Sequence, residues 1–264
     1  MKRESFGSRL GFILVSAGCA IGIGNVWKFP YICGAYGGAA FILIYLCFLV
    51  ILGIPVLVAE FAVGRGSHTS VAKCFDKLAP AGSCWKPLKF IGIIGCYMLM
   101  MFYTTVGGWM IYYCVKSLRG DFVGATPEAV TQSFSDMLGN APTMMLWMVI
   151  ICLIGFAVCF MGLQNGIEKI SKVMMSALLI IMVILAVHSV MMEGAGEGIR
   201  FYLIPDFQKI KEAGVGNVVF AALSQSFFTL SIGIGAMLIF GSYLDKSRSL
   251  TGEAVSITVL DTFV

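Results

Sequence analysis

Charged residues are scarce in this sequence. Asp, Glu, Lys and Arg make up 12% of the 264 residues, whereas a soluble domain carries about 25%. So few charged groups argue against a protein that keeps a large surface in water. The net charge of +4 is also small, and nucleic-acid binding depends on concentrated basic charge that holds phosphates. We therefore expect a membrane protein without a nucleic-acid partner.

Residues in spacings typical of catalysis or metal binding are also lacking. The two histidines, His68 and His188, are isolated from each other, and the nine cysteines lie mostly within apolar runs without metal or disulfide spacing. Such cysteines are usually small buried apolar residues. The segment Gly22-Ile23-Gly24 is only a fragment of a phosphate-binding loop and follows no strand pattern. We find no pairing of a nucleophile with a base, and we expect no enzyme.

Apolar residues dominate instead. They make up 59% of the chain, and the mean hydropathy is +0.92. A membrane-spanning helix needs about 20 apolar residues, so the chain has room for about seven spans. We expect an all-α membrane protein with spans at about 10–33, 39–63, 88–115, 143–161, 167–190, 215–244 and 250–264.

Lys and Arg residues predict the orientation. Most of the 18 basic residues fall in the N-terminal segment and in the loops that follow even-numbered spans. Because such loops stay in the cytoplasm, the N-terminus is expected there. The segments 119–142 and 191–214 then lie on the outer side.

The first span is interrupted at its centre. The run from Ser16 to Asn25 carries Gly18, Gly22 and Gly24 as well as a polar amide. Glycine lowers the cost of leaving a helix, and irregular backbone at membrane depth persists only inside protein or along a cavity. The sequence therefore predicts a break here, and its simplest alternative is a glycine-packed helix contact.

The sixth span repeats this pattern. Ile21-Gly22-Ile23-Gly24 recurs as Ile232-Gly233-Ile234-Gly235. Two glycine-interrupted spans in corresponding places indicate the binding site of a transporter, and the first and sixth spans cross the membrane in opposite senses, as in inverted repeats. Chance recurrence in glycine- and isoleucine-rich sequence is the alternative.

The chemistry of the two breaks suits an ion and a small solute. Carbonyl oxygens freed near Gly18, Ala20 and Ile21, together with Asn25, are ligands for a hard cation. The helix that restarts beyond Gly22 points N–H groups toward an anion such as a carboxylate. The sixth span adds the hydroxyl groups and apolar walls of Thr229, Ser231, Phe228 and Ile234.

Two carboxylates and a tyrosine lie at membrane depth. Glu60 is near the end of the second span, Asp261 is in the seventh and Tyr103 is in the third. Because an intramembrane carboxylate is energetically costly, a functional or networked role is expected. We expect Glu60 to accept hydrogen bonds from the unwound backbone of the sixth span and Asp261 to coordinate an ion.

Several motifs together resemble one family. They are Arg9-Leu10-Gly11, Gly18 to Pro30, Gly53-Ile54-Pro55 with Glu60, Tyr202 to Phe207, and Gln225 to Gly235. In this order they resemble the neurotransmitter:sodium symporter family, especially its bacterial amino-acid transporters, over essentially the whole chain. The resemblance implies an inverted-repeat transporter fold with discontinuous helices 1 and 6. Residues 1–190 would form the first five-helix repeat, 191–214 an extracellular loop, and 215–264 a partial second repeat.

The resemblance also implies ligands. One sodium ion would bind the Ala20 carbonyl, Asn25, Thr229 and Asp261, and a second the carbonyls of Gly18 and Ile21. The amino-acid substrate would meet Ala20, Gly22, Gly24, Leu99, Tyr103, Phe228, Ser231 and Ile234. Gate or structural roles fall to Lys28, Glu60 and Gln225. Family members that carry amines have Asp at the position of Gly22, so glycine there implies a substrate that brings its own carboxylate.

Departures from the family pattern qualify this reading. The family has more spans, so we expect the second sodium site and the second repeat to be incomplete. We also expect the acidic partner that the family has for Lys28 to be absent. Ser176 stands where the family has proline after Gly166. We expect sodium-coupled symport of an amino acid, apolar by its pocket walls, across the cytoplasmic membrane by alternating access. The alternatives are a truncated, non-transporting membrane fragment of such a symporter and, with less support, a channel.

Overall fold

The fold is described from a computed structural model, which covers residues 6–264. These residues form helices and connecting turns, without a strand among them. Two compact units divide the chain. The first combines the residues up to Ile93 with Leu163–Val264, and the second is Ile94–Gly162. Each unit is described by itself.

Four helical stretches are long and apolar enough to span a membrane. They are Ala39–Ser67, Leu88–Arg119, Ala141–Phe160 and Leu163–Val190. A fifth span is formed if the bent pair Arg9–Ala20 and Gly24–Ala35 counts as one, with an angle of 48° between its halves. The expected sixth and seventh spans consist of shorter helices. The sequence therefore predicted the positions of these five spans, including the bent one, whereas the helices at 215–244 and 250–264 are individually too short to count as spans.

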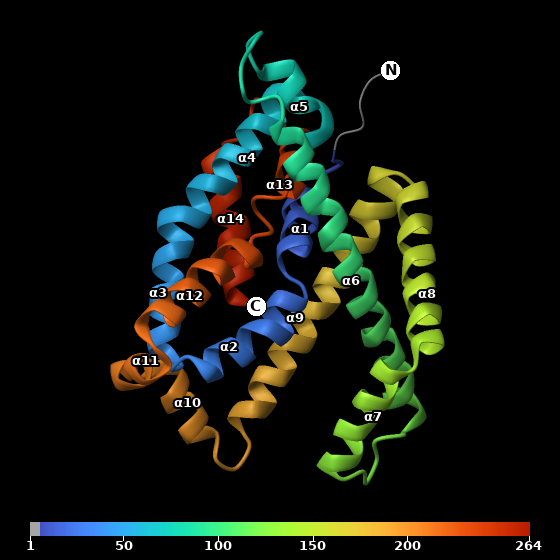
Figure 1. The fold of residues 1–264 in the computed structure, drawn as a ribbon, viewed down its shortest axis with the longest axis vertical. Coiled ribbons are helices and arrows are strands. Elements are labelled where there is room, and N and C mark those ends of the chain that lie inside the picture. Colours follow the sequence, from blue (N-terminus) through green and yellow to red (C-terminus); the bar gives the residue numbers. More distant parts are fainter. Residues whose placement is uncertain (1–5) are drawn as a thin grey trace. The chain divides into compact units, whose positions relative to one another are not determined.

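The first span breaks where its glycines cluster. Helix α1, Arg9–Ala20, begins at Ser8, whose hydroxyl accepts a hydrogen bond from the Gly11 amide. It ends because the backbone of Ile21 is extended. The chain resumes as a π-helical turn, η1 (Gly24–Lys28), and then as α2 (Phe29–Ala35) (Figure 1).

The second span runs without interruption despite its proline. It consists of α3 (Ala39–Phe48), the π-helical turn η2 (Leu49–Gly53) and α4 (Ile54–Ser67). Pro55 lies in the first turn of α4. Proline lacks an amide donor, and the wider turn that precedes it accommodates the missing hydrogen bond.

The sixth span breaks more widely than the first. Helix α12, Val215–Thr229, is separated from α13, Ala236–Gly241, by six residues without helical structure. Ser231, Gly233 and Gly235 have positive φ angles of 51°, 91° and 79°. Glycine adopts this conformation readily, whereas serine does so at a cost.

Close helix contacts organise the first unit. A Cβ added at Gly64 of α4 would collide with the Leu238 carbonyl oxygen, and one at Gly241 would lie 2.6 Å from the Phe61 Cα. The α4–α13 contact therefore depends on glycine, as is common between membrane helices. The remaining helices of this unit are α5 (Val71–Leu78), η3 (Leu163–Glu168), α9 (Lys169–Val190), α10 (Ala195–Leu203), α11 (Phe207–Ala213) and α14 (Leu250–Phe263).

The second unit is built from two apolar helices and a surface helix. It contains most of α6 (Leu88–Arg119), together with α7 (Pro127–Gly139) and α8 (Ala141–Phe160). Helices α6 and α8 pack closely, because a Cβ at Gly108 would lie 2.9 Å from the Met148 amide nitrogen.

Candidate functional site

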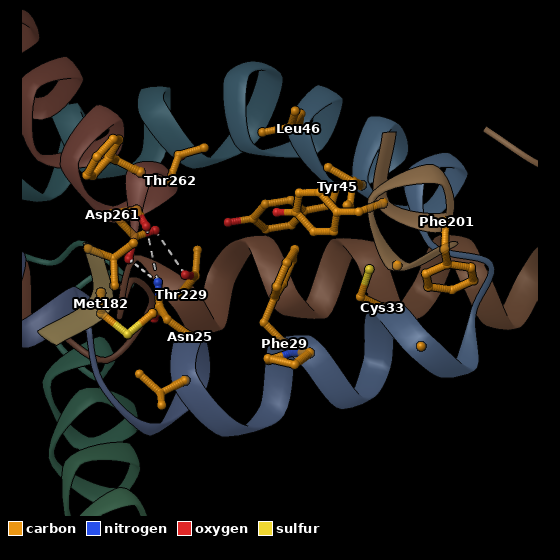
Figure 2. A pocket seen from close by; sticks show the side chains of 18 residues that line it. Asn25, Phe29, Cys33, Tyr45, Leu46, Met182, Phe201, Thr229, Asp261 and Thr262 are labelled. Atoms are coloured by element: carbon orange, nitrogen blue, oxygen red, sulfur yellow. Dashed lines mark hydrogen bonds between the residues drawn. The ribbon is translucent and has the colours of Figure 1, made fainter. Parts of the chain in front are cut away.

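Three polar side chains from three elements meet beside the break in the first span. The Asn25 side-chain amide, on η1, donates to Asp261 Oδ1 at 2.9 Å, and the Thr229 hydroxyl, at the end of α12, donates to Asp261 Oδ2 at 2.9 Å. Asp261 lies on α14, and both it and Thr229 are 1% exposed. Figure 2 shows both donors pointing at the carboxylate.

The charge of this group calls for a cation. Both donors to Asp261 are neutral, and a buried carboxylate that lacks an opposite charge is unfavourable. Among the described residues, no Lys or Arg forms an ion pair with Asp261. The three side chains supply oxygen atoms, the ligands that a hard cation such as sodium prefers.

Backbone oxygens from the break lie close by in sequence. In the described part of the chain, no hydrogen bond reaches the carbonyl oxygens of Gly18, Ala20 or Ile21. The Cys19 carbonyl, by contrast, accepts a hydrogen bond of 2.8 Å from the Ser231 hydroxyl. This hydrogen bond connects the turn after α12 to the end of α1. The turn is strained, because Ser231 has a positive φ angle.

Phe228 and Gly24 pack against each other across the two breaks. A Cβ at Gly24 would lie 2.8 Å from Phe228 Cε1, whereas one at Gly22 would meet no atom within 4 Å. The Lys28 ammonium lies 4.0 Å from the centre of the Phe228 ring. Gln225 approaches from α12 and donates a long hydrogen bond of 3.5 Å to the Gly24 carbonyl.

Glu60 holds the opened backbone of the sixth span. Its Oε1 accepts a hydrogen bond of 2.6 Å from the Gly233 amide, and its Oε2 accepts one of 3.2 Å from the Leu238 amide. A carboxylate that receives two backbone donors compensates the helical hydrogen bonds lost at the break. Glu60 therefore accepts hydrogen bonds from the opened backbone of the sixth span, as expected from the sequence.

A cavity lies on one side of the Asp261 network. Its volume is about 600 Å³, and Asn25, Thr229 and Asp261 line it, whereas Phe228, Ser231 and Ile234 do not. Figure 2 shows Tyr45 and Phe29 farther along it. Sequence reasoning missed Tyr45, which is 4% exposed. A tyrosine inside an otherwise apolar span was the available signal.

Two of the predicted substrate residues belong to the other unit. Leu99 and Tyr103 lie on α6 within Ile94–Gly162, so the structure does not place them relative to Asp261. Ile234 lies within the break of the sixth span and is half-buried.

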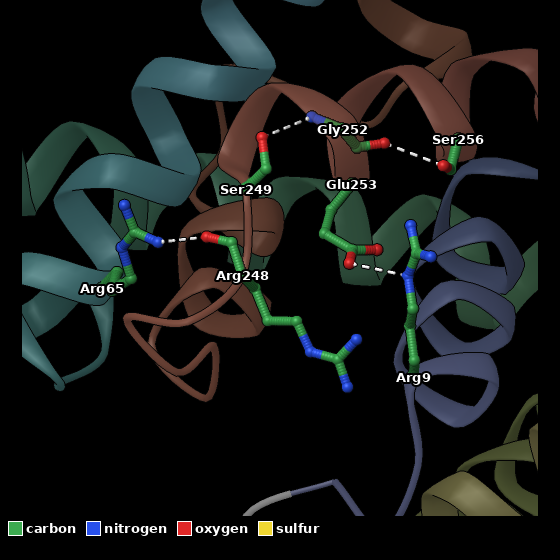
Figure 3. Close-up of polar contacts among 7 residues, drawn as sticks. All are labelled: Arg9, Arg65, Arg248, Ser249, Gly252, Glu253 and Ser256. Atoms are coloured by element: carbon green, nitrogen blue, oxygen red, sulfur yellow. Dashed lines mark hydrogen bonds and ion pairs between the residues drawn. The ribbon is translucent and has the colours of Figure 1, made fainter.

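Ionic contacts at the start of α1 were not foreseen from the sequence. Arg9 Nε donates to Glu253 Oε1 at 2.9 Å, and Arg65 donates to the Arg248 carbonyl at 2.8 Å (Figure 3). Glu168 is buried and accepts hydrogen bonds from the Gly7 amide at 2.9 Å and from the Lys172 ammonium at 2.6 Å. The contacts of Arg9 and Glu168 fix the start of α1 to α14 and η3, at the end of α1 opposite the break, and the contact of Arg65 connects α4 to the loop before α14.

Comparison with known proteins finds a matching protein family and a similar solved structure. The model of the sodium:neurotransmitter symporter family matches residues 3–133 and 128–264. A solved structure, the crystal structure of MhsT in complex with L-phenylalanine, superimposes with a TM-score of 0.89 and 38% sequence identity. The match covers 99% of this chain and 58% of that chain.

Curated relatives agree with this match. The uncharacterized sodium-dependent transporter YhdH of Bacillus subtilis is 35% identical over 263 residues, which is 100% of this chain and 57% of YhdH. An uncharacterized sodium-dependent transporter of Methanocaldococcus jannaschii is 32% identical over 99% of this chain and 53% of its own length. The chain thus spans a little more than half the length of these relatives.

Proposed function

Because the chain belongs to the sodium:neurotransmitter symporter family, which consists of multi-pass secondary transporters and not of enzymes, we propose that it takes part in sodium-coupled symport of an apolar amino acid by alternating access. The observation that carries the proposal is the contact of Asn25 and Thr229 with the same carboxylate, Asp261. One bound cation there would connect both broken helices.

A first sodium ion would bind between the two breaks. The Ala20 carbonyl, Asn25, Thr229 and Asp261 would supply its oxygen ligands. The free carbonyl of Ala20 and the uncompensated charge of Asp261 support this assignment. Sodium would replace the hydrogen bonds from Asn25 and Thr229 to the carboxylate, and its own ligands would then connect η1, α12 and α14.

A second sodium ion would bind on the other side of the break. The carbonyl oxygens of Gly18 and Ile21 would contribute to it, and both accept no hydrogen bond among the described residues. We propose that this site is incomplete within the present chain, because two carbonyl oxygens are too few for a sodium shell.

The substrate would lie against the opened backbone near Gly22 and Gly24. The empty space beside Gly22 leaves room for a carboxylate that meets backbone N–H groups and the first sodium ion. Phe228 and Ile234 would contact the rest of the substrate, and roles for Leu99 and Tyr103 are proposed from the family resemblance alone. The ammonium group would meet Ser231 and the carbonyls of Ala20 and Phe228. MhsT was crystallised with L-phenylalanine, which supports an apolar amino acid here.

The arrangement in the membrane also belongs to the proposal. The basic residues support a cytoplasmic N-terminus in the cytoplasmic membrane. The repeat division at 1–190, 191–214 and 215–264 places one broken helix at the start of each repeat. Lys28 and Gln225 would act at the outer side of the breaks, where they contact Phe228 and Gly24.

Binding of a radiolabelled amino acid tests this function. The purified chain in detergent is incubated with labelled phenylalanine or leucine in sodium chloride, and in potassium chloride at the same ionic strength. We expect saturable binding in sodium that falls at least tenfold in potassium. Equal binding in both salts, or stronger retention of a labelled amine without a carboxylate, would contradict the proposal.

A further inference from the structure

A second cavity lies wholly within the second unit. It measures about 460 Å³ and opens between the last turns of α6, the helix α7 and the start of α8. Apart from Ala129 and Met137, its lining is polar and consists of Tyr112, Lys116, Gln132, Ser133, Asp136, Asn140 and Thr143. The proposed amino-acid symport uses none of these residues. The volume is within the range of small-ligand sites.

Helix α7 directs its polar face toward this cavity. Gln132, Ser133 and Asp136 line the space. The large apolar side chains of Val130, Phe134 and Leu138 recur every fourth residue and stay 38–43% exposed, although the Phe134 ring also packs against Trp109 and Tyr113 of α6. A surface helix in water would normally bury its apolar stripe. The partly exposed stripe fits a helix whose apolar side chains also meet lipid and whose polar side chains meet a ligand.

Two charged side chains line the cavity, Lys116 and Asp136, and each forms a hydrogen bond with a neutral side chain. The Lys116 ammonium donates to the Ser133 hydroxyl at 2.8 Å and lies 5.5 Å from the ring centres of Tyr112 and Phe122. Among residues 6–264 it has no ion-pair partner. The Asp136 carboxylate accepts a hydrogen bond of 2.8 Å from the Gln132 amide. Both charges are therefore available to a ligand of opposite charge.

The cavity lies where the apolar helices end. Lys116 is in the last turn of the long apolar helix α6, and Asn140 immediately precedes the apolar helix α8. Tyr113 of α6 and Trp147 of α8 lie within two turns of these ends and Trp109 of α6 within three, and such aromatic residues are typical of the membrane–water interface. In a bilayer, the mouth of the cavity would lie at the depth of the lipid headgroups.

We propose that this cavity binds the headgroup of a phospholipid that carries both a phosphate and an ammonium group. The phosphate would meet Lys116 and Ser133, because a phosphate is a strong acceptor for an ammonium and a hydroxyl. The ammonium would meet Asp136. The acyl chains would follow the apolar stripe of Val130, Phe134 and Leu138. This site does not depend on the proposed symport function.

Native mass spectrometry of the full chain with added phosphatidylethanolamine tests the proposal. We expect Lys116→Met to weaken binding of this lipid about tenfold, as for loss of one hydrogen bond to a charged group. Arg119→Met is the matched control, because Arg119 is an exposed cation at the end of α6 that does not line the cavity. It should leave binding unchanged. Equal losses of lipid binding in both variants would show that basic residues at the interface attract the lipid without a specific site, and would refute the proposal.

A second comparison identifies the ligand class and remains informative if Lys116→Met does not fold. Asp136→Asn should weaken binding of phosphatidylethanolamine but not of phosphatidylglycerol, which has no ammonium group. The same loss for both lipids would refute the role of Asp136. Soluble phosphoethanolamine should compete at least a hundredfold more weakly than the lipid, since it lacks acyl chains. Competition at equal concentration would show a site for a water-soluble ligand and refute the lipid assignment.

Discussion

The side-chain amide of Asn25 lies 2.9 Å from the carboxylate of Asp261, although 236 residues separate them in sequence. The same carboxylate receives the hydroxyl of Thr229. The broken first span is thus linked to α14, and through one side chain to the end of α12. Any ligand that changes the contacts of Asp261 would act on three elements at once, which is the behaviour that coupling between an ion and a substrate requires.

Removal of Asn25 or Asp261 should weaken sodium-dependent binding. We expect Asn25→Ala and Asp261→Ala to reduce amino-acid affinity in sodium by about ten- to a hundredfold, since each change deletes an interaction with a charged group. Equilibrium binding of labelled amino acid at several sodium concentrations measures this. Cys19→Ala is the control, because Cys19 contacts Ser231 through its backbone carbonyl. Equal effects of all three substitutions would count against the proposed site.

Chloride should be dispensable. Asp261 already provides a fixed negative charge beside the proposed first sodium ion, and no described Lys or Arg neutralises it. A mobile anion would add a second negative charge to a buried site, which is unfavourable. Uptake or binding assays in sodium gluconate and in sodium chloride should therefore give the same affinity. A requirement for chloride would show that Asp261 does not supply this charge.

The sequence predicted where the spans break but not how. Ile-Gly-Ile-Gly occurs in both breaks, yet Gly233 and Gly235 have positive φ angles while Gly22 and Gly24 do not. Identical tetrapeptides differ here because their partners differ. Glu60 receives the Gly233 amide, and no comparable carboxylate bonds to the backbone of the first break within the described residues. Local sequence therefore indicates that a helix opens, and long-range contacts determine the shape of the opening.

Contacts between distant side chains were the part that sequence could not provide. Neither Arg9 nor Glu253 has a spacing that reveals its partner, although Glu253 is 2% exposed and its pairing with Arg9 fixes α1 against α14. The acidic partner that the family has for Lys28 was expected to be missing, and no sequence pattern indicated the aromatic contact that its ammonium makes instead with Phe228. Such pairs depend on how the helices pack, which composition and periodicity do not determine.

Replacement of Glu60 by glutamine should destabilise the break of the sixth span. Glu60→Gln keeps the shape of the side chain but turns one acceptor into a donor that faces a backbone amide of Gly233 or Leu238. Loss of a hydrogen bond to a charged group costs about 1.5–3 kcal/mol, so the melting temperature should fall by about 5 °C. Thermal unfolding of the purified protein in detergent measures the change.

Glu193→Gln is the matched control for this substitution. Glu193 is exposed in the turn after α9, and no described residue forms an ion pair with it. It should leave the melting temperature unchanged. If Glu60→Gln were as stable as this control, the two hydrogen bonds to Glu60 would have no part in holding the backbone open.

The two glycines of the first break should respond differently to a methyl group. Gly24→Ala would place its Cβ 2.8 Å from Phe228 Cε1, so Phe228 must move, whereas Gly22→Ala would meet no atom within 4 Å. Overpacking of this kind costs about 1–3 kcal/mol, and we expect Gly24→Ala to lower the melting temperature while Gly22→Ala does not. If the substrate carboxylate occupies the space beside Gly22, Gly22→Ala should still weaken sodium-dependent amino-acid binding. A stable Gly22→Ala variant with unchanged affinity would show that the substrate does not bind beside Gly22, because the added methyl group would then have displaced no part of it.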